Sequence, residues 1–481
     1  MNNARYLKQT LLNLVNDLSL NHREFLFHPN SDFSRNRKLP FETVIQFILC
    51  MEASPIKDEL YNHFGLNINI PSASAFVQQR GKINYEAFQW LFESFNSKTY
   101  KSENNLYKGY RLLAIDGCST PIRTDVNDKK TYVDRHSMLG YNAYHLNALY
   151  DLMEHTYNDV IVQDEPSKDE NDAFYKLVDR YNGSKAIFIA DRGYESYNGF
   201  EHVVHSGNKY LIRVKDITSR NCMTQTLGPY PDQDEFDIDV SRMLTLKQTN
   251  TIKENPQFYR FISNKSTFDY MDKNNPFYEF NCRIVRFKIA DDTYECVITN
   301  LDRDEFPAEE IKRLYNLRWG IETSFRELKY AVCLNAFHSK KHNSIKQEIY
   351  ARLLFYNFSE RIMRHVKPKA SRRKRKYSYQ INFTRAFHNI REFLRYKKGG
   401  KLPPDIESII AKEIEPIRPG RSSPRNVRCK PAEYFIYRLN WPTSLYTFDN
   451  VVSILHFFAY KKLKPEKKHT IFLTLVYLTL N

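Results

Sequence analysis

The amino-acid sequence predicts an α/β protein whose mixed-sheet core is interrupted by a β-rich insertion and flanked by helical regions. Two short apolar runs, 112–115 and 186–190, each lead into an aspartate and a glycine-containing turn, as buried strands do. Between residues 216 and 300 apolar and charged residues alternate, which indicates strands with one solvated face. Helical patterns dominate the first 100 residues and the chain after Pro307. The expected divisions are a helical DNA-binding region at 1–105, the first part of the core at 106–216, the insertion at 217–300, the last part of the core at 301–366 and a basic region at 367–481.

Positive charge is concentrated in one part of the chain. The formal net charge is +16, and residues 361–430 hold 21 Lys and Arg against five Asp and Glu, so the remainder is neutral. A local excess of this size is expected of a surface that binds a polyanion such as DNA, although a solvated basic face is the alternative. The densest run, and the first candidate for contacts with DNA phosphates, is Arg372, Arg373, Lys374, Arg375 and Lys376.

Cysteine usage and hydropathy favour a cytoplasmic location. The seven cysteines are scattered and contain no Cys-x-x-Cys pair, which predicts reduced thiols. Cys333, His338 and His342 have spacing that suggests zinc, but a fourth ligand is not evident. The sequence starts without the apolar core of a signal peptide, and no apolar run approaches the roughly 20 residues of a membrane-spanning helix.

Three helices are expected near the N-terminus, at 41–51, 56–64 and 72–82. A helix, a connection containing glycine and a polar helix form a pattern that can place its second helix in a DNA major groove. The alternative is a helical cap without a DNA-reading role. The candidates for reading DNA bases are Gln78, Gln79, Arg80 and Lys82.

The first part of the core is predicted to alternate strands and helices. Ser167 and Glu170 have the spacing of a capping box, so a helix is expected to begin there. A second helix is expected at 197–205. Further strands are expected at 144–152, 159–163 and 210–214.

The stretch 315–329 is predicted to lie on one helix. At about 100° per residue, Tyr315, Arg318, Glu322 and Lys329 share one face. Glu322 then sits between two cations, beside the apolar stripe of Leu314, Ile321 and Leu328. By itself this pattern is typical of an amphipathic helix with ordinary ion pairs.

Three carboxylates, in this order along the chain, form a candidate catalytic group: Asp116, Asp191 and Glu322. Ligands of open α/β sheets bind at strand ends, where the two aspartates are expected. Carboxylate oxygens suit Mg²⁺, with Mn²⁺ as a substitute. Two such ions about 3.5–4 Å apart can support an in-line displacement at phosphorus. Arg318 and Lys329, on the glutamate's helix face, are suited to phosphate contacts.

These motifs resemble those of a family of bacterial insertion-sequence transposases of the DDE class. The segment Tyr315-x2-Arg318-x3-Glu322-x6-Lys329 is similar to the family's Tyr-Arg-Glu-Lys signature. The segment 113–117 resembles its first aspartate motif and 190–194 its second. A β-rich segment precedes the glutamate helix, as in the family. The resemblance covers roughly residues 30–440.

The resemblance implies a ribonuclease-H-like catalytic core with Asp116, Asp191 and Glu322 as metal ligands. It implies that Tyr315, Arg318 and Lys329 hold the terminal phosphates of the element's DNA. The implied reaction is metal-dependent nicking of the element ends and transfer of the freed 3′-OH into target DNA. The implied partners are double-stranded DNA, both terminal inverted repeats and target, and a second copy of the chain. The implied location is the bacterial cytoplasm, at the nucleoid.

Two other functions are compatible with parts of the sequence. The basic segment also suits a non-catalytic DNA-binding relic or a repressor of transposition, although all three carboxylates and both cations are present. A metal-dependent phosphohydrolase of small substrates would share the carboxylates, but it would leave the clustered positive charge without a role.

Overall fold

A large mixed sheet forms the centre of the computed structural model, which describes residues 3–35, 37–100, 105–135, 140–220, 222–263, 266–368, 376–396 and 404–418. The strand order is β2-β3-β1-β5-β6-β10-β9-β7-β8, and β4 pairs with β3. A separate pair joins β11 (Tyr379–Ile381) to β12 (Ile414–Pro416). The strands of the large sheet are β1 (Arg111–Ile122), β2 (Tyr132–Val133), β3 (Tyr141–Asp151), β4 (Thr156–Asp164), β5 (Ala186–Ala190), β6 (Lys209–Val214), β7 (Phe236–Thr245), β8 (Tyr259–Phe261), β9 (Phe277–Ala290) and β10 (Thr293–Thr299). The predicted α/β class with a mixed sheet is confirmed.

Strand β1 is paired along both edges. It runs parallel to β5 up to the pair Ile115 and Ala190, and antiparallel to β3 as far as Ile122. The expectation that β1 ends at Asp116 is therefore wrong, because hydrogen bonding to β3 carries the strand on for six more residues. Strand β5, by contrast, has the predicted bounds and ends immediately before Asp191.

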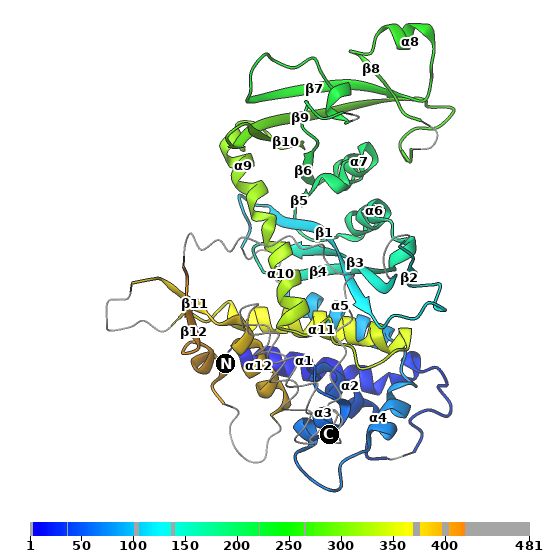
Figure 1. Cartoon of the computed structure of the whole chain (residues 1–481), viewed down its shortest axis with the longest axis vertical. Helices are drawn as coiled ribbons and strands as arrows, with labels where there is room; N and C mark the ends of the chain where they lie inside the picture. The colour runs from blue at the N-terminus through cyan, green and yellow to red at the C-terminus, as the bar shows by residue number, and fades with distance from the viewer. Residues whose placement is uncertain are drawn as a thin grey trace, which may run out of the picture. The chain divides into compact units, whose positions relative to one another are not determined.

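Both faces of the sheet are buried. On β1, Leu112 and Ala114 belong to the hydrophobic core that also contains Ile321 of helix α10. Leu113 and Ile115 belong to the other core, with Phe174 of helix α6. Figure 1 shows α6 (Glu170–Arg180) and α7 (Tyr197–His205) on one face, and α9 (Ala308–Leu317) and α10 (Trp319–Tyr330) on the other. The continuous apolar runs of β1 and β5 follow from this, since both faces must be covered.

The β-rich segment continues the same sheet. Strands β7, β8 and β9 follow β10, which pairs antiparallel with core strand β6. A short helix, α8 (Asn250–Glu254), precedes β8 (Figure 1). The insertion thus extends the sheet outward on the side away from β3.

The N-terminal and C-terminal helices pack together beneath the core around α11 (His342–Met363) (Figure 1). All but three of the 22 residues of α11 are buried. The other helices of this layer are α1 (Asn3–Leu20), α2 (Phe41–Leu49), α3 (Ile56–Phe64), α4 (Ala73–Arg80), α5 (Glu86–Thr99), α12 (Phe383–Arg395) and α13 (Ile406–Ile410). Single 3₁₀ turns are η1 (His22–Phe25), η2 (Glu165–Ser167), η3 (Arg192–Tyr194) and η4 (Thr224–Thr226). Across the described ranges, no helix combines the length and apolar content needed to cross a bilayer.

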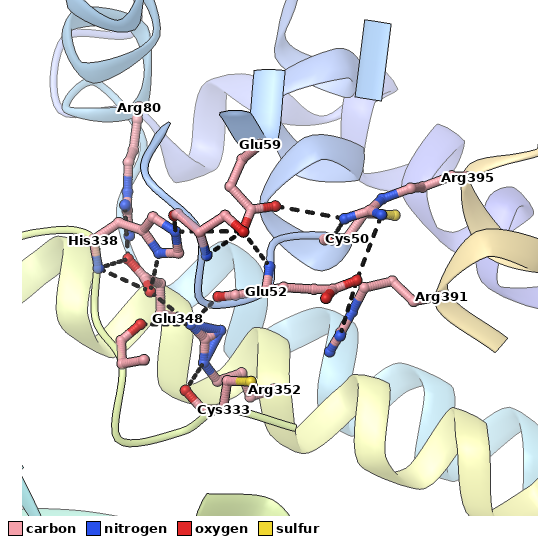
Figure 2. Close-up of polar contacts among 12 residues, drawn as sticks. Cys50, Glu52, Glu59, Arg80, Cys333, His338, Glu348, Arg352, Arg391 and Arg395 are labelled. Atoms are coloured by element: carbon pink, nitrogen blue, oxygen red, sulfur yellow. Dashed lines mark hydrogen bonds and ion pairs between the residues drawn. The ribbon is translucent and has the colours of Figure 1, made fainter. Parts of the chain in front are cut away.

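A buried ionic cluster joins these helices (Figure 2). Glu348 of α11 lies 2.8 Å from Arg80, 3.0 Å from His338 and 3.0 Å from Arg352. Glu59 of α3 accepts hydrogen bonds from the backbone of residues 52 and 54. Its second oxygen lies 3.5 Å from Arg395 of α12. The pKa of Glu348 lies well below its ordinary value, because the neighbouring cations outweigh its burial.

The cluster corrects the expectation for helix α4. Arg80 is buried and donates to the Gln347 side chain, and Gln79 is buried as well. Neither side chain can reach DNA bases in this structure. Gln78 is exposed, and Lys82 is partly buried and 3.6 Å from Asp32.

Some arginines of the basic segment 361–430 form ion pairs inside the protein. Arg391 and Arg395 lie 3.5 Å from Glu52, and Arg361 lies 3.8 Å from Glu154. Their acidic partners lie outside residues 361–430, so the surface excess is smaller than the sequence count. Residues Arg372–Arg375 fall outside the described ranges, and Lys376 is exposed.

Glu348→Gln tests the cluster. The change leaves the buried guanidinium groups of Arg80 and Arg352 without their common carboxylate, so the free energy of unfolding should fall by about 3–5 kcal/mol. Asp17→Ala, which removes an exposed ion pair with Lys98, is the control and should cost less than about 1 kcal/mol. Urea unfolding followed by circular dichroism measures both. If both substitutions lower the free energy of unfolding equally, Glu348 does not have the stabilising role assigned to it.

Candidate active site

The sheet register brings two of the three predicted carboxylates together. Since Ile115 pairs with Ala190, the next residues along the two parallel strands are Asp116 and Asp191. Side chains alternate along a strand, so Asp116 follows Leu112 and Ala114 to the face that α10 covers. Asp191 follows Ile187 and Ile189 to the same face.

Glycine amides hold both aspartates. The amide of Gly117 donates to Asp116 Oδ1 at 2.8 Å, and the amide of Gly193 donates to Asp191 Oδ1 at 2.7 Å. Asp191 is the N-cap of turn η3, which directly follows the end of β5. The local sequences Asp-Gly and Asp-Arg-Gly thus fix where the two carboxylates lie.

The third carboxylate lies in the first turn of α10. The predicted single helix is interrupted at Arg318, which ends α9 and begins α10. Arg318 Nη1 lies 2.9 Å from Glu322 Oε1. The predicted stripe is confirmed, because Leu314, Ile321 and Leu328 are fully buried.

Two polar residues of α10 outside the apolar stripe also contact the interior. Ser324 is buried and lies 2.9 Å from the Tyr157 hydroxyl. Glu327 accepts a hydrogen bond from Tyr356 at 3.0 Å. The buried side of α10 is wider than its apolar residues indicate, because tyrosine hydroxyls of β4 and α11 supply polar partners.

The three carboxylates act on one another. The pKa of Asp116 is raised to about 6, first by burial and then by the negative charges of Asp191 and Glu322, while the Gly117 amide and Arg318 oppose the rise. Within the described ranges, however, no three His, Cys, Asp or Glu side chains are arranged as a ligand set for a metal ion. The carboxylates are neighbours, but their side chains do not converge on one point.

Arg318 is the buried cation of the site, with 4% of its surface exposed. Its guanidinium lies 5.6 Å from the Tyr315 ring and 5.1 Å from the Trp319 ring, and its Nε has no hydrogen-bond partner among the described atoms. Tyr315 is buried, whereas Trp319 is 56% exposed. Lys329, three turns of helix further on than Arg318, is partly exposed.

The structure adds residues that sequence reasoning missed. His145 of β3 is buried beside Gly117, with Nε2 3.0 Å from Glu170 and Nδ1 3.4 Å from Glu165. Burial lowers the pKa of His145, but these two carboxylates raise it to a value above its ordinary one. Tyr194, in the turn after Asp191, is buried and interacts electrostatically with Asp116, Glu170 and Asp191.

Glu170 is not part of a capping box. The N-cap of α6 is Asp169, whose side chain accepts from the Asp172 amide at 2.9 Å, and Ser167 belongs to turn η2. The Glu170 side chain is turned to His145 instead. The spacing of Cys333, His338 and His342 that suggested zinc also has another explanation. His338 lies in the buried ionic cluster, whereas His342 contacts Tyr144 and Asp128.

The protein-family comparison decides the family. The model of the transposase DDE domain matches residues 107–358, which contain all three carboxylates. The chain belongs to this family.

Individual transposases are similar to the chain to different extents. Transposase InsG for insertion sequence element IS4, from Escherichia coli K12, is 22% identical over 426 residues, covering 83% of this chain and 88% of InsG. InsL for IS186A and the transposase for IS421, both from Escherichia coli, are each 40% identical over 58 residues. That stretch covers 12% of this chain and only 16% of each of these relatives. A piggyBac transposase in a synaptic complex with hairpin DNA aligns with 88% of this chain and 87% of its own at 10% identity and a TM-score of 0.44.

The raised pKa of Asp116 predicts a stability change that depends on pH. The folded protein binds the Asp116 proton more tightly than the unfolded chain, so this group lowers stability as the pH rises from about 4 to about 6. In a chelator, Asp116→Asn should therefore raise the free energy of unfolding at pH 7.5 by about 3 kcal/mol. The gain should shrink as the pH falls to 4.5.

Thermal unfolding at both pH values measures this effect. Asp232→Asn is the control, because Asp232 is exposed in the loop before β7 and should show no such pH dependence. An equal effect of Asp116→Asn at both pH values would contradict the raised pKa.

Proposed function

We propose that this member of the DDE transposase family nicks the ends of its insertion element and joins the freed 3′-OH to target DNA. The observation that carries the proposal is that Asp116 and Asp191 are neighbours in the β1–β5 register and that Asp116 is influenced electrostatically by Glu322 of α10, which is paired to Arg318. Carboxylates and a phosphate-binding cation in one place suit phosphoryl transfer to and from DNA.

The catalytic core is proposed to be ribonuclease-H-like. In support, the core strands follow the order β4-β3-β1-β5-β6, with β3 antiparallel to its neighbours and β1, β5 and β6 parallel. Helices cover both faces, and the glutamate helix packs against β1. This arrangement brings the ends of β5 and of the parallel half of β1 to one edge.

Divalent cations are proposed as cofactors, Mg²⁺ or Mn²⁺, with two ions expected. Two observations suit a cation here: the carboxylates of Asp116, Asp191 and Glu322 repel one another, and the buried Tyr194 hydroxyl beside them has no described hydrogen-bond partner. These three carboxylates would hold the cation, which would supply activation of the attacking oxygen and stabilisation of the leaving oxygen. Because Glu322 is now 2.9 Å from Arg318, it would exchange this partner for the cation.

The cations of the helix are proposed to hold the DNA. Arg318 lies beside the carboxylates, and its guanidinium is proposed to pair with a phosphate of the element end when Glu322 exchanges it for the cation. Lys329 is partly exposed on α10 and can act on the neighbouring phosphate as a point charge. Tyr315 is buried against the Arg318 guanidinium, so its proposed contribution is to support that guanidinium beside the phosphates.

Double-stranded DNA is the proposed partner, both as element ends and as target. Two ends have to be joined together, so a homodimer in the DNA complex is proposed. The bacterial cytoplasm, at the nucleoid, is the proposed location.

Removal of a carboxylate tests the catalytic assignment. Asp116→Ala, Asp191→Ala and Glu322→Gln should each lower Mn²⁺-dependent cleavage of DNA carrying the flanks of this reading frame by more than about 100-fold, since outer-sphere changes at metal sites already cost 10–100-fold. Gel analysis of a labelled fragment gives the rates. Glu309→Gln, an exposed carboxylate in the first turn of α9, and Asp232→Asn are the matched controls and should cleave normally.

The same assay separates the other functions. Cleavage that survives in any of the three variants would contradict the site. Binding of the ends without cleavage by the unaltered protein would favour a relic or repressor. Hydrolysis of free nucleotides without any dependence on DNA would favour a phosphohydrolase.

The basic run tests the assigned DNA contacts. Changing Arg372, Arg373, Lys374, Arg375 and Lys376 to Gln should weaken binding to every DNA sequence alike, because phosphate contacts carry no base information. The slope of log affinity against log salt should become shallower by about 0.9 for each lost contact. Fluorescence anisotropy at several salt concentrations measures this. The control is Lys57, Lys98 and Lys176 changed to Gln, and an unchanged slope in the first variant would contradict its contact with DNA.

A further inference from the structure

A histidine–glutamate pair lies beside the two glycines whose amides hold Asp116 and Asp191. His145 sits on β3, two residues along from the partner of Gly117 in the β1–β3 register. A methyl group placed on Gly117 would collide with His145 Nε2 and lie 3.2 Å from Glu170 Oε1. One placed on Gly193 would lie 4.0 Å from Glu170 Oε2. Glu170 therefore lies beside both glycines whose amides hold Asp116 and Asp191.

The contacts of Glu170 show how it is held. Its Oε1 is 3.0 Å from His145 Nε2 and 3.4 Å from Lys168 Nζ, and its side chain is 35% exposed. His145, only 3% exposed at its side chain, is held in turn by Glu165, 3.4 Å from Nδ1. A buried histidine thus fixes a carboxylate that is still open to solvent on one side.

A second observation points to a ligand at this place. The Tyr194 hydroxyl is nearly fully buried, and it has no hydrogen-bond partner among the described atoms. The carboxylates that act on it electrostatically are Asp116, Glu170 and Asp191. Buried hydroxyls are rarely left without a partner, so the Tyr194 hydroxyl is suited to a polar ligand beside these carboxylates.

We propose that Glu170 and the Tyr194 hydroxyl form the rear wall of the catalytic site, where they hydrogen-bond to water molecules of a bound, hydrated divalent cation. Mg²⁺ and Mn²⁺ keep several waters when few side chains coordinate them, and these waters need acceptors around them. Asp116 and Asp191 approach from the face covered by α10, and Glu170 approaches from the face covered by α6. His145 is the positioning residue of Glu170, since its Nε2 lies 3.0 Å from the Glu170 carboxylate beside Gly117.

The proposal rests on the proposed function, and metal binding tests it without any turnover. Isothermal titration calorimetry with MnCl₂ should show a dissociation constant 10–100-fold weaker for Glu170→Gln than for the unaltered protein, as for other outer-sphere changes. Tyr194→Phe keeps the ring packed on Phe174 and should weaken Mn²⁺ about tenfold by removing only the hydroxyl. Asp172→Asn removes a carboxylate from the same turn of α6, one that pairs with Lys176 on the surface, and should bind Mn²⁺ normally.

The double variant shows whether the two groups share a ligand. If both groups contact one water, the effects of the two substitutions on Mn²⁺ affinity should not be independent. The fold-loss in affinity of the double variant Glu170→Gln with Tyr194→Phe should then be smaller than the product of the two single fold-losses. A fully multiplicative loss would contradict a shared water. Thermal unfolding in a chelator accompanies each variant, so that a folding defect is recognised by a lowered midpoint before any Mn²⁺ is added.

The outcomes separate this inference from the proposed function. If the unaltered protein binds Mn²⁺, Asp116→Ala abolishes binding and Glu170→Gln binds like Asp172→Asn, then the rear wall is wrong and the catalytic assignment stands. If the unaltered protein binds no Mn²⁺ in the presence or absence of DNA, both are overturned. If Glu170→Gln and Tyr194→Phe both weaken binding while the affinity for DNA in a chelator is unchanged, the inference is supported.

Discussion

The pairing of strand β1 on both edges is the constraint on which the site depends. Parallel pairing with β5 stops at Ile115 and Ala190, and this sets Asp116 beside Asp191. Antiparallel pairing with β3 continues, and this sets His145 beside Gly117. A slip of one residue on either edge would turn Asp116 to the α6 face and away from Glu322. Such a slip would be costly because residues 112–115 are apolar and buried on both faces of the sheet. Leu112 and Ala114 pack in one core and Leu113 and Ile115 in the other, and a slip would exchange them.

Buried ion pairs hold together the helical layer that supports helix α10. Three ion pairs lie in this layer (Figure 2): Arg80 with Glu348, Arg391 with Glu52 and Arg395 with Glu59. Helices α3, α4, α11 and α12 are therefore joined by ion pairs as well as by apolar contacts. Removing one member of such a cluster is destabilising because the remaining charges stay buried. Helix α11 also carries Tyr356, which donates to Glu327 of the glutamate helix. The layer that joins the two ends of the chain is thus the support against which α10 is set.

The sequence predicts correctly those strands and helices whose ends are marked by nearby residues. The runs 186–190 and 197–205 became β5 and α7 with the predicted bounds, because apolar residues and turn residues mark both ends. Sequence reasoning misplaced the end of β1, since pairing with a distant strand decides whether an Asp-Gly pair is a turn or part of a strand. Glu170 was assigned to a capping box because the spacing from Ser167 fits, whereas its partner lies 25 residues away on another strand. Arg80 looked like a surface residue because nothing near it in sequence reveals Glu348.

The electrostatics of the site favour the proposed binding of divalent cations. Asp116, Asp191, Glu322 and Glu170 are four carboxylates around one edge of the sheet, and a DNA phosphate would add further negative charge. Burial, and after it the negative charges of Asp191 and Glu322, raise the pKa of Asp116, so like charges disfavour one another where water is partly excluded. Arg318 pairs with Glu322, and His145 and Lys168 both lie against Glu170. Within the part of the chain that the structure describes, backbone amides donate to Asp116 and Asp191, and Arg318 acts on Asp116. The repulsion that remains is centred on this pair, which the register of β1 and β5 brings together. A binding site for a divalent cation is therefore expected at the same pair, and its affinity should rise with every unit of negative charge that the surrounding protein leaves uncompensated.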